Sequence, residues 1–164
     1  MEHEDTSRLD PQLVEALGSL PYGLYFLGVG SRENPHGMLV SWVSQVSGDP
    51  PMLMAAVRHN RGTLQALRER GAFSLNLLPA GDSDLVRLLA RPAAGRLEGV
   101  ALEQGPLGLP VLVGGLGALC CQVIETFQPG DHVLLVGQVA GTLWRGNGEV
   151  YTAGQAGHAY LGLR

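Results

Sequence analysis

The segment spanning residues 37–57, GMLVSWVSQVSGDPPMLMAAV, limits the possible folds more than any other part of the chain. Apolar side chains recur with period two through residues 38–47, which predicts a β-strand. Asp49-Pro50-Pro51 must end that strand, because proline cannot donate to a strand ladder and also restricts the residue before it. Residues 52–57 are almost wholly apolar and predict a second strand. The segment therefore predicts a sheet protein with two consecutive strands separated by prolines.

The first of these strands mixes polar and apolar side chains. Ser41 and Ser44 stand among Val40, Trp42 and Val43. Such a strand can pack one face against a core while its other face offers hydroxyl and backbone N–H groups to a flat polar ligand. The alternative is an ordinary core strand whose serines lie at a sheet edge or in water. The alternation alone leaves both interpretations open.

Three segments predict helices from their capping residues and leucine spacing. Asp10-Pro11 is a typical helix start, and leucines follow at helical spacing up to residue 20. A second helix is predicted from Asn60, as N-cap, to Gly71, where a glycine commonly ends a helix. Asp82 or Ser83 is predicted to cap a third helix, which ends before a proline at position 92.

The remaining periodic segments predict strands. The pattern places strands at residues 23–30, 72–78, 111–113, 119–127, 132–144 and 149–152. Residues 23–30 are expected to form a hairpin with the strand that begins at residue 38. A Gly-Asn-Gly sequence at residues 146–148 predicts a second hairpin, between the last two strands. Because strands and helices do not alternate regularly, short antiparallel strands in a small barrel fit better than a parallel sheet.

The length and charge of the chain limit its organisation and its partners. With 164 residues it is expected to form a tail over residues 1–9 and a single domain over residues 10–164. A net charge of −4 disfavours nucleic acid as a partner, and no apolar run is long enough to span a membrane. The polar, acidic first ten residues lack the apolar run of a signal peptide. The two cysteines are adjacent and cannot easily pair with each other, so the cytoplasm is the expected location.

Most familiar catalytic and metal-binding motifs are absent. The Gly-x-Gly sequences at residues 28–30 and 115–117 lack the third glycine of a dinucleotide fingerprint, and the chain has no lysine for a phosphate loop. The histidines are scattered and the cysteines lack metal-site spacing, so no metal is expected. Cys121 lies within an apolar strand, which favours a buried, inert thiol over a nucleophile.

Two sites remain as candidates for binding and catalysis. Asn60, Arg61 and Thr63 open a helix directly after an apolar strand, where free N–H groups, a hydroxyl and a guanidinium could hold a phosphate. The alternative there is a simple N-cap with a solvated arginine. His132 lies where a turn enters a long strand, a position that often borders a barrel mouth. A histidine that merely caps a turn at the surface is the alternative.

Taken together, four stretches resemble the flavin reductase-like family of FMN-binding split barrels. They are LPYGLYFLGVG at residues 20–30, GMLVSWVSQVSGDPP at residues 37–51, HNRGTLQALRERGAFSLNLL at residues 59–78 and GDHVLLVGQV at residues 130–139. The resemblance implies a mainly β fold, namely an antiparallel Greek-key split β-barrel with a few short helices, usually as a homodimer. It covers most of the chain from residue 20 onward.

The resemblance also implies a function and its residues. It implies an NAD(P)H-dependent flavin reductase that transfers a hydride to FMN or FAD and passes reduced flavin or electrons to a partner such as a monooxygenase. His132 would lie near the flavin where nicotinamide docks. The implied flavin contacts are Val40, Ser41, Trp42, Val43, Ser44, Gln45, Asn60, Arg61 and Thr63. Trp42 is larger than the residues common at its position in this family, which could restrict the flavin or the donor. The alternative function is a non-enzymatic FMN protein for electron transfer or redox sensing.

Overall fold

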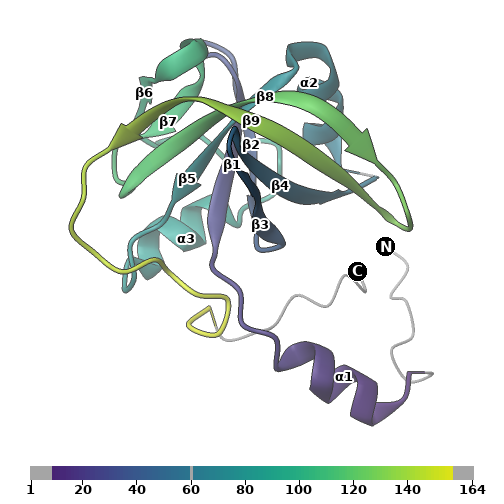
Figure 1. The fold of residues 1–164 in the computed structure, drawn as a ribbon. Coiled ribbons are helices and arrows are strands. Elements are labelled where there is room, and N and C mark those ends of the chain that lie inside the picture. The colour runs from purple at the N-terminus through teal and green to yellow at the C-terminus, as the bar shows by residue number, and fades with distance from the viewer. Residues whose placement is uncertain (1–8, 60, 157–164) are drawn as a thin grey trace.

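A computed structural model describes residues 9–59 and 61–156 and shows a mainly β protein (Figure 1). Its helices are α1 Pro11–Gly18, α2 Gly62–Arg70 and α3 Ser83–Leu89, with a short 3₁₀ helix, η2, at Pro106–Gly108. Its strands are β1 Tyr25–Gly30, β2 Pro35–Val40, β3 Val43–Gly48, β4 Pro51–Arg58, β5 Ala72–Leu77, β6 Leu102–Gln104, β7 Pro110–Leu112, β8 Gly117–Phe127 and β9 His132–Trp144.

Seven of these strands form one antiparallel sheet. Its order is β2-β1-β5-β8-β9-β4-β3, and β6 pairs separately with β7. The two edge strands, β2 and β3, are consecutive in the chain and are joined by only two residues. The sheet must therefore curl until its edges approach each other, as in a split barrel. Within the described residues no strand ladder joins β2 to β3, so the sheet is curled but not closed.

The inner face of the curled sheet encloses the main hydrophobic core. β1, β4, β5 and β9 contribute most of its side chains, and α2 adds two leucines that cover one end. A smaller cluster packs between α3 and the segment near residue 151. The buried members of the main core are Leu27, Val29, Val40, Leu53, Ala55, Val57, Leu64, Leu67, Phe73, Leu75, Cys121, Val133 and Leu135.

Several local predictions are confirmed. Asp10 caps α1, where its carboxylate accepts a hydrogen bond of 3.0 Å from the backbone N–H of Gln12. Gly71 ends α2 in the left-handed conformation with φ of 67°, which glycine adopts at little cost. Asp82 caps α3 through the N–H of Leu85. The first predicted hairpin is also present, since β1 pairs with β2.

The predicted continuous strand over residues 38–47 is wrong. β2 ends at Val40 and β3 begins at Val43, so Ser41 and Trp42 lie between two strands that belong to opposite edges of the sheet. The N–H of Val43 turns back to the carbonyl of Ser41, and the carbonyl of Trp42 accepts from the N–H of Ala56 on β4 at 2.9 Å. Val40 of β2 is buried in the core and Val43 of β3 packs against it, whereas Val46 of β3 is 51% exposed, so on the second strand the period-two pattern does not correspond to burial.

The predicted final hairpin is also wrong. Residues 146–148 all have positive φ, with Asn147 at 62°, but the chain only bends at Gly148 and forms no hairpin turn there. The chain then leaves β9 and crosses to the other end of the sheet, where Val150 forms an isolated bridge with Pro79 and Thr152 forms one with Gly23. This path places Tyr151 in the smaller core cluster, where burial of its ring outweighs simple hairpin pairing.

Candidate functional site

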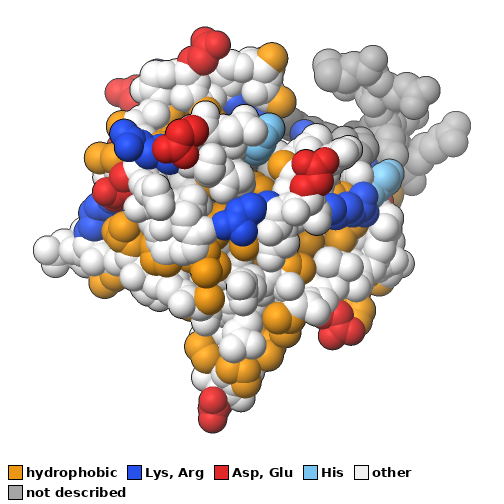
Figure 2. Space-filling view, turned by 90° about the horizontal axis from the view of Figure 1, so that it is seen from above, with side chains coloured by type: hydrophobic (Ala, Val, Ile, Leu, Met, Phe, Trp, Pro, Cys, Tyr) orange, Lys and Arg blue, Asp and Glu red, His pale blue; other side chains and the backbone are white. Residues whose placement is uncertain are grey.

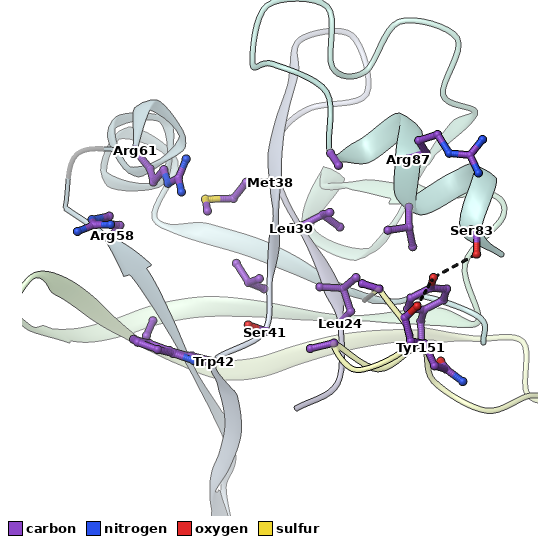
Figure 3. Close-up of a pocket in the computed structure, with 17 residues that line it drawn as sticks. Leu24, Met38, Leu39, Ser41, Trp42, Arg58, Arg61, Ser83, Arg87 and Tyr151 are labelled. Carbon is purple, nitrogen blue, oxygen red and sulfur yellow. Dashed lines mark hydrogen bonds between the residues drawn. The ribbon is translucent and has the colours of Figure 1, made fainter. Parts of the chain in front are cut away.

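A cavity of about 420 Å³ lies where the end of β2 meets β4, α3 and the segment after residue 150 (Figure 3). That volume is in the range of small-molecule sites. Most of its lining is apolar, and its polar groups come from a few side chains at its borders. The lining residues are Leu24, Met38, Leu39, Val40, Ser41, Trp42, Ala56, Arg58, Arg61, Ser83, Val86, Arg87, Ala90, Tyr151, Ala153, Gln155 and Ala156.

The cavity has two chemically different sides. Figure 3 shows Arg58 and Arg61 on one side, beyond Met38. On the opposite side Ser83 and Tyr151 point toward each other, and their hydroxyl oxygens are 3.2 Å apart. Between the two sides lie apolar side chains, with the Ser41 side chain at the bottom. The cavity therefore combines an apolar interior with cationic side chains on one side, which suits a ligand with an apolar body and a negative group.

A polar cluster lies behind the cavity wall at the start of β9. The carboxylate of Asp131 lies 2.6 Å from Nδ1 of His132 and 3.5 Å from a guanidinium nitrogen of Arg58. Since an ionised carboxylate can only accept, Nδ1 of His132 carries the proton in this contact. The Trp42 ring packs on the other side of the imidazole, with the ring centroids 4.5 Å apart. Asp131 thus connects a cavity arginine with the histidine.

The electrostatics of this cluster favour an ionised Asp131. The hydrogen bond from His132 is the main cause that lowers the pKa of this carboxyl, and the charges of His132 and Arg58 act in the same direction. The side chains of Arg58 and His132 are 7% and 6% exposed, whereas that of Asp131 is 54% exposed. The carboxylate therefore faces water and fixes two buried side chains from outside.

A larger space adjoins the cavity on the far side of β2, and we call it the adjoining groove. Its volume is about 960 Å³. It shares Met38, Leu39, Arg61 and Ala90 with the cavity, so the two spaces are neighbours. Thr63, at the start of α2, lines the groove. The remaining lining residues are Pro35, His36, Gly37, Gly62, Leu89, Pro92, Ala93, Gly95, Arg96, Leu97 and Glu98.

The structure distributes the predicted site residues over several places. Val40, Ser41, Trp42 and Arg61 line the cavity, and Arg61 and Thr63 line the adjoining groove. His132 lies under the Trp42 ring and is in neither lining. Asn60 lies outside the described residues.

Three predicted contacts lie further along the chain, on β3. Val43, Ser44 and Gln45 belong to neither lining set. The Ser44 hydroxyl donates to the carbonyl of Gln45, and the Gln45 amide donates to that of Ser47. These residues lie beyond the break at Ser41 and Trp42 and outside the cavity lining.

The sequence interpretation missed the residues that form the far side of the cavity. Leu24, Ser83, Tyr151 and Gln155 come from segments widely separated along the chain. Tyr151 is 3% exposed, and its hydroxyl hydrogen-bonds with that of Ser83 at the start of α3. This contact fixes the last described segment against the cavity. An aromatic residue next to a Gly-Asn-Gly sequence was a usable signal, because a buried tyrosine needs both a core and a hydroxyl partner.

Fold and site together define a class: a split-barrel protein with an apolar cavity that arginine side chains border on one side. Comparison with known families identifies the family within this class. The model of the flavin reductase like domain matches residues 17–158. The chain belongs to this family.

Curated relatives agree with the family assignment. The chain is 32% identical over 140 residues to the flavin reductase (NADH) of Kitasatospora aureofaciens, covering 80% of this chain and 73% of the relative. It is 31% identical over 153 residues to the NADH-dependent flavin reductase of a Rhodococcus species, covering 88% and 85%. It is also 33% identical over 135 residues to diflavin flavoprotein A 1 of Synechocystis, covering 80% of this chain but only 24% of that longer protein.

Solved structures share the fold. The NADH:FAD oxidoreductase SgcE6 of Streptomyces globisporus superposes with a TM-score of 0.78 at 26% identity, covering 87% of this chain and 89% of that one. The same protein has been solved in complex with NAD and FAD fragments. The FMN-binding protein of Thermus thermophilus superposes with a TM-score of 0.71 at 26% identity, covering 77% and 72%.

The residues present fit a flavin. The apolar middle of the cavity suits the ring system, and Arg61 with the adjoining start of α2 suits a phosphate. Within residues 9–59 and 61–156, no group of three or more potential ligand side chains could hold a metal ion. In that same part of the chain, no helix has the length and apolar character needed to cross a bilayer.

Proposed function

We propose that this protein is a flavin reductase that uses NADH or NADPH to reduce FMN or FAD. The observation that carries the proposal is the cavity, whose apolar interior is bordered by Arg58 and Arg61. The chain that forms it belongs to the flavin reductase like family. A bound flavin supplies the hydride-accepting chemistry. The contribution of the protein is to bind, to orient and to exclude water.

Each part of the site has a task in this proposal. The Trp42 ring and the apolar side chains would hold the flavin ring in a dry slot, and the backbone around Ser41 would present polar groups to its edge. Arg61 and Thr63 would hold the phosphate, with Asn60 as a further phosphate ligand. His132, fixed by Asp131, would support the Trp42 ring from behind, and the family resemblance implies that nicotinamide docks nearby.

The test is NADH and NADPH oxidation by the purified protein with FMN or FAD. We expect flavin-dependent donor oxidation, and we expect His132→Ala to retain flavin binding while it slows turnover. Tight binding of yellow flavin without donor oxidation would instead support a non-enzymatic electron-transfer or sensing protein. Failure to bind either flavin would refute both functions.

We further propose that reduced flavin is passed to a partner oxygenase in the cytoplasm. A relative 31% identical over 128 residues is named as the reductase component of a 4-nitrophenol monooxygenase in Rhodococcus opacus, which supports such a partner. Cys120 and Cys121 are buried free thiols, which suits a reducing compartment.

We also propose that two copies of the chain pair. α1 lies apart from the sheet in Figure 1, and none of its residues is buried. Leu13, Leu17 and Leu20 are 46%, 37% and 50% exposed, so the apolar stripe predicted from the sequence lacks cover within the described chain. Figure 2 shows hydrophobic side chains at several other places on one face, interspersed with charged ones. A second copy is the occupant that the family resemblance implies for such surfaces.

Pairing predicts a solution mass of twice 17.3 kDa. We expect light scattering after gel filtration to give this mass for the wild type, and Leu13→Glu with Leu17→Glu to shift it toward the monomer. Charges on the stripe would have to be desolvated in an interface but not in a monomer. A monomeric wild type, or a double variant that still pairs fully, contradicts the use of α1.

A further inference from the structure

Trp42, and not His132, provides the cavity surface where these two rings meet. The Trp42 side chain belongs to the cavity lining (Figure 3). His132 is 5% exposed and belongs to the lining of neither the cavity nor the adjoining groove. The two ring centroids are 4.5 Å apart, with an angle of 39° between the planes. A ligand in the cavity therefore meets the indole, and the imidazole lies behind it.

Both rings of this pair are held by contacts outside the cavity. The carbonyl of Trp42 accepts a hydrogen bond of 2.9 Å from the N–H of Ala56 on β4, which fixes the backbone that carries the indole. The imidazole of His132 is fixed by its Nδ1, which lies 2.6 Å from the Asp131 carboxylate. The Tyr22 ring is a second aromatic neighbour of the indole, with the centroids 6.5 Å apart. The imidazole is therefore a rigid support for the indole.

The place of Trp42 in the chain makes a support of this kind important. Ser41 and Trp42 form the connection between β2 and β3, so the half-buried indole does not belong to either strand. Holding such a side chain in one orientation costs conformational entropy. Packing against an imidazole that Asp131 already fixes offsets this cost, because aromatic pairs stabilise each other beyond the area they bury.

From these contacts we propose that Trp42 is the residue that aligns the reacting rings, and that His132 is a positioning residue that acts on the reaction only through Trp42. The inference rests on the proposed function. A displacement of about 1 Å at a reacting centre can cost on the order of a hundredfold in rate, so the orientation of the indole governs turnover. This assignment differs from the direct position beside nicotinamide that the family resemblance implies for His132.

A double-mutant cycle on NADH or NADPH oxidation with FMN tests this dependence. Alone, His132→Ala should lower kcat by about tenfold or more, because the indole loses its support. In a Trp42→Ala background the same change should alter kcat by less than about twofold, because the residue that transmits its effect is absent. An equal loss of kcat in the two backgrounds means that the imidazole acts directly, and it overturns the inference.

Two replacements separate the ring of His132 from its polar atoms. His132→Phe keeps an aromatic ring behind the indole but removes both ring nitrogens, so we expect kcat within about threefold of the wild type. His132→Gln keeps an N–H donor for Asp131 but has no ring, and it should resemble His132→Ala. If His132→Phe is no more active than His132→Ala, the reaction needs the imidazole itself and the inference is wrong.

Tryptophan fluorescence reports the position of Trp42 without any ligand. The chain has two tryptophans, and Trp144 is 58% exposed at the end of β9, so Trp144→Phe leaves Trp42 as the only indole. In this background we expect His132→Ala to raise the acrylamide quenching constant about twofold or more, and His132→Phe to restore it. The control is His59→Ala, an exposed histidine outside both linings, which should change neither the quenching constant nor kcat.

The fluorescence measurement also separates failure of this inference from failure of the proposed function. If the wild type reduces neither FMN nor FAD, the proposed function fails, and the quenching constants alone decide whether His132 holds Trp42. If the wild type reduces flavin but His132→Ala leaves the quenching constant unchanged, only the positioning role of His132 is overturned.

Discussion

Replacing Phe73 with alanine should lower the free energy of unfolding by about 3–5 kcal/mol, as expected when a fully buried phenylalanine is truncated. Phe73 lies in β5, the third of seven strands in the sheet order, and it is 0% exposed. A Cβ placed on Gly137 of β9 would come within 2.9 Å of that ring. The ring therefore fills the space that a glycine on the neighbouring part of the sheet leaves open, and its removal creates a cavity there.

Urea denaturation at constant protein concentration measures this effect. Phe127→Ala is a suitable control, since Phe127 is a strand phenylalanine at 49% exposure. Its truncation should change the unfolding free energy by less than about 1 kcal/mol. If both variants lost a similar amount of unfolding free energy, burial in the curled sheet would not be the reason for the effect at Phe73.

Reversing the charge of Arg61 should have the largest effect on ligand binding. Arg61 lines both the cavity and the adjoining groove, where a phosphate would join the two halves of the site. Loss of a charge-assisted hydrogen bond corresponds to about 10- to 150-fold weaker binding, and the introduced carboxylate adds repulsion. We therefore expect Arg61→Glu to weaken both FMN and FAD by at least about tenfold.

The comparison with Arg68→Glu tests whether the effect on binding depends on where the charge is reversed. Both arginines are exposed and belong to or adjoin α2, but Arg68 lies in the last turn of that helix and outside both linings. Binding titrations with FMN and FAD should show little change for Arg68→Glu. Equal weakening in the two variants would mean that overall charge, rather than a phosphate contact at Arg61, governs binding. In that case the assigned phosphate site is wrong.

Features that depend on a few neighbouring residues were predictable. The caps at Asp10, Gly71 and Asp82 follow from side-chain or backbone geometry within one helical turn, and the structure contains all three. The strand at residues 52–57 follows from a local apolar run and appears as part of β4. The family resemblance added the split barrel, which periodicity alone did not specify.

The sequence by itself therefore determined the three helices and most of the strands, and which segments carry the candidate binding groups Ser41, Arg61 and Thr63. Only the tertiary structure decided that the strand breaks at Ser41 and Trp42, and that Tyr151 lies across the cavity. The physical reason is the distance along the chain over which each interaction acts. Caps and period-two patterns act over a few residues, whereas the cavity exists because the sheet curls and brings together side chains that are distant along the chain.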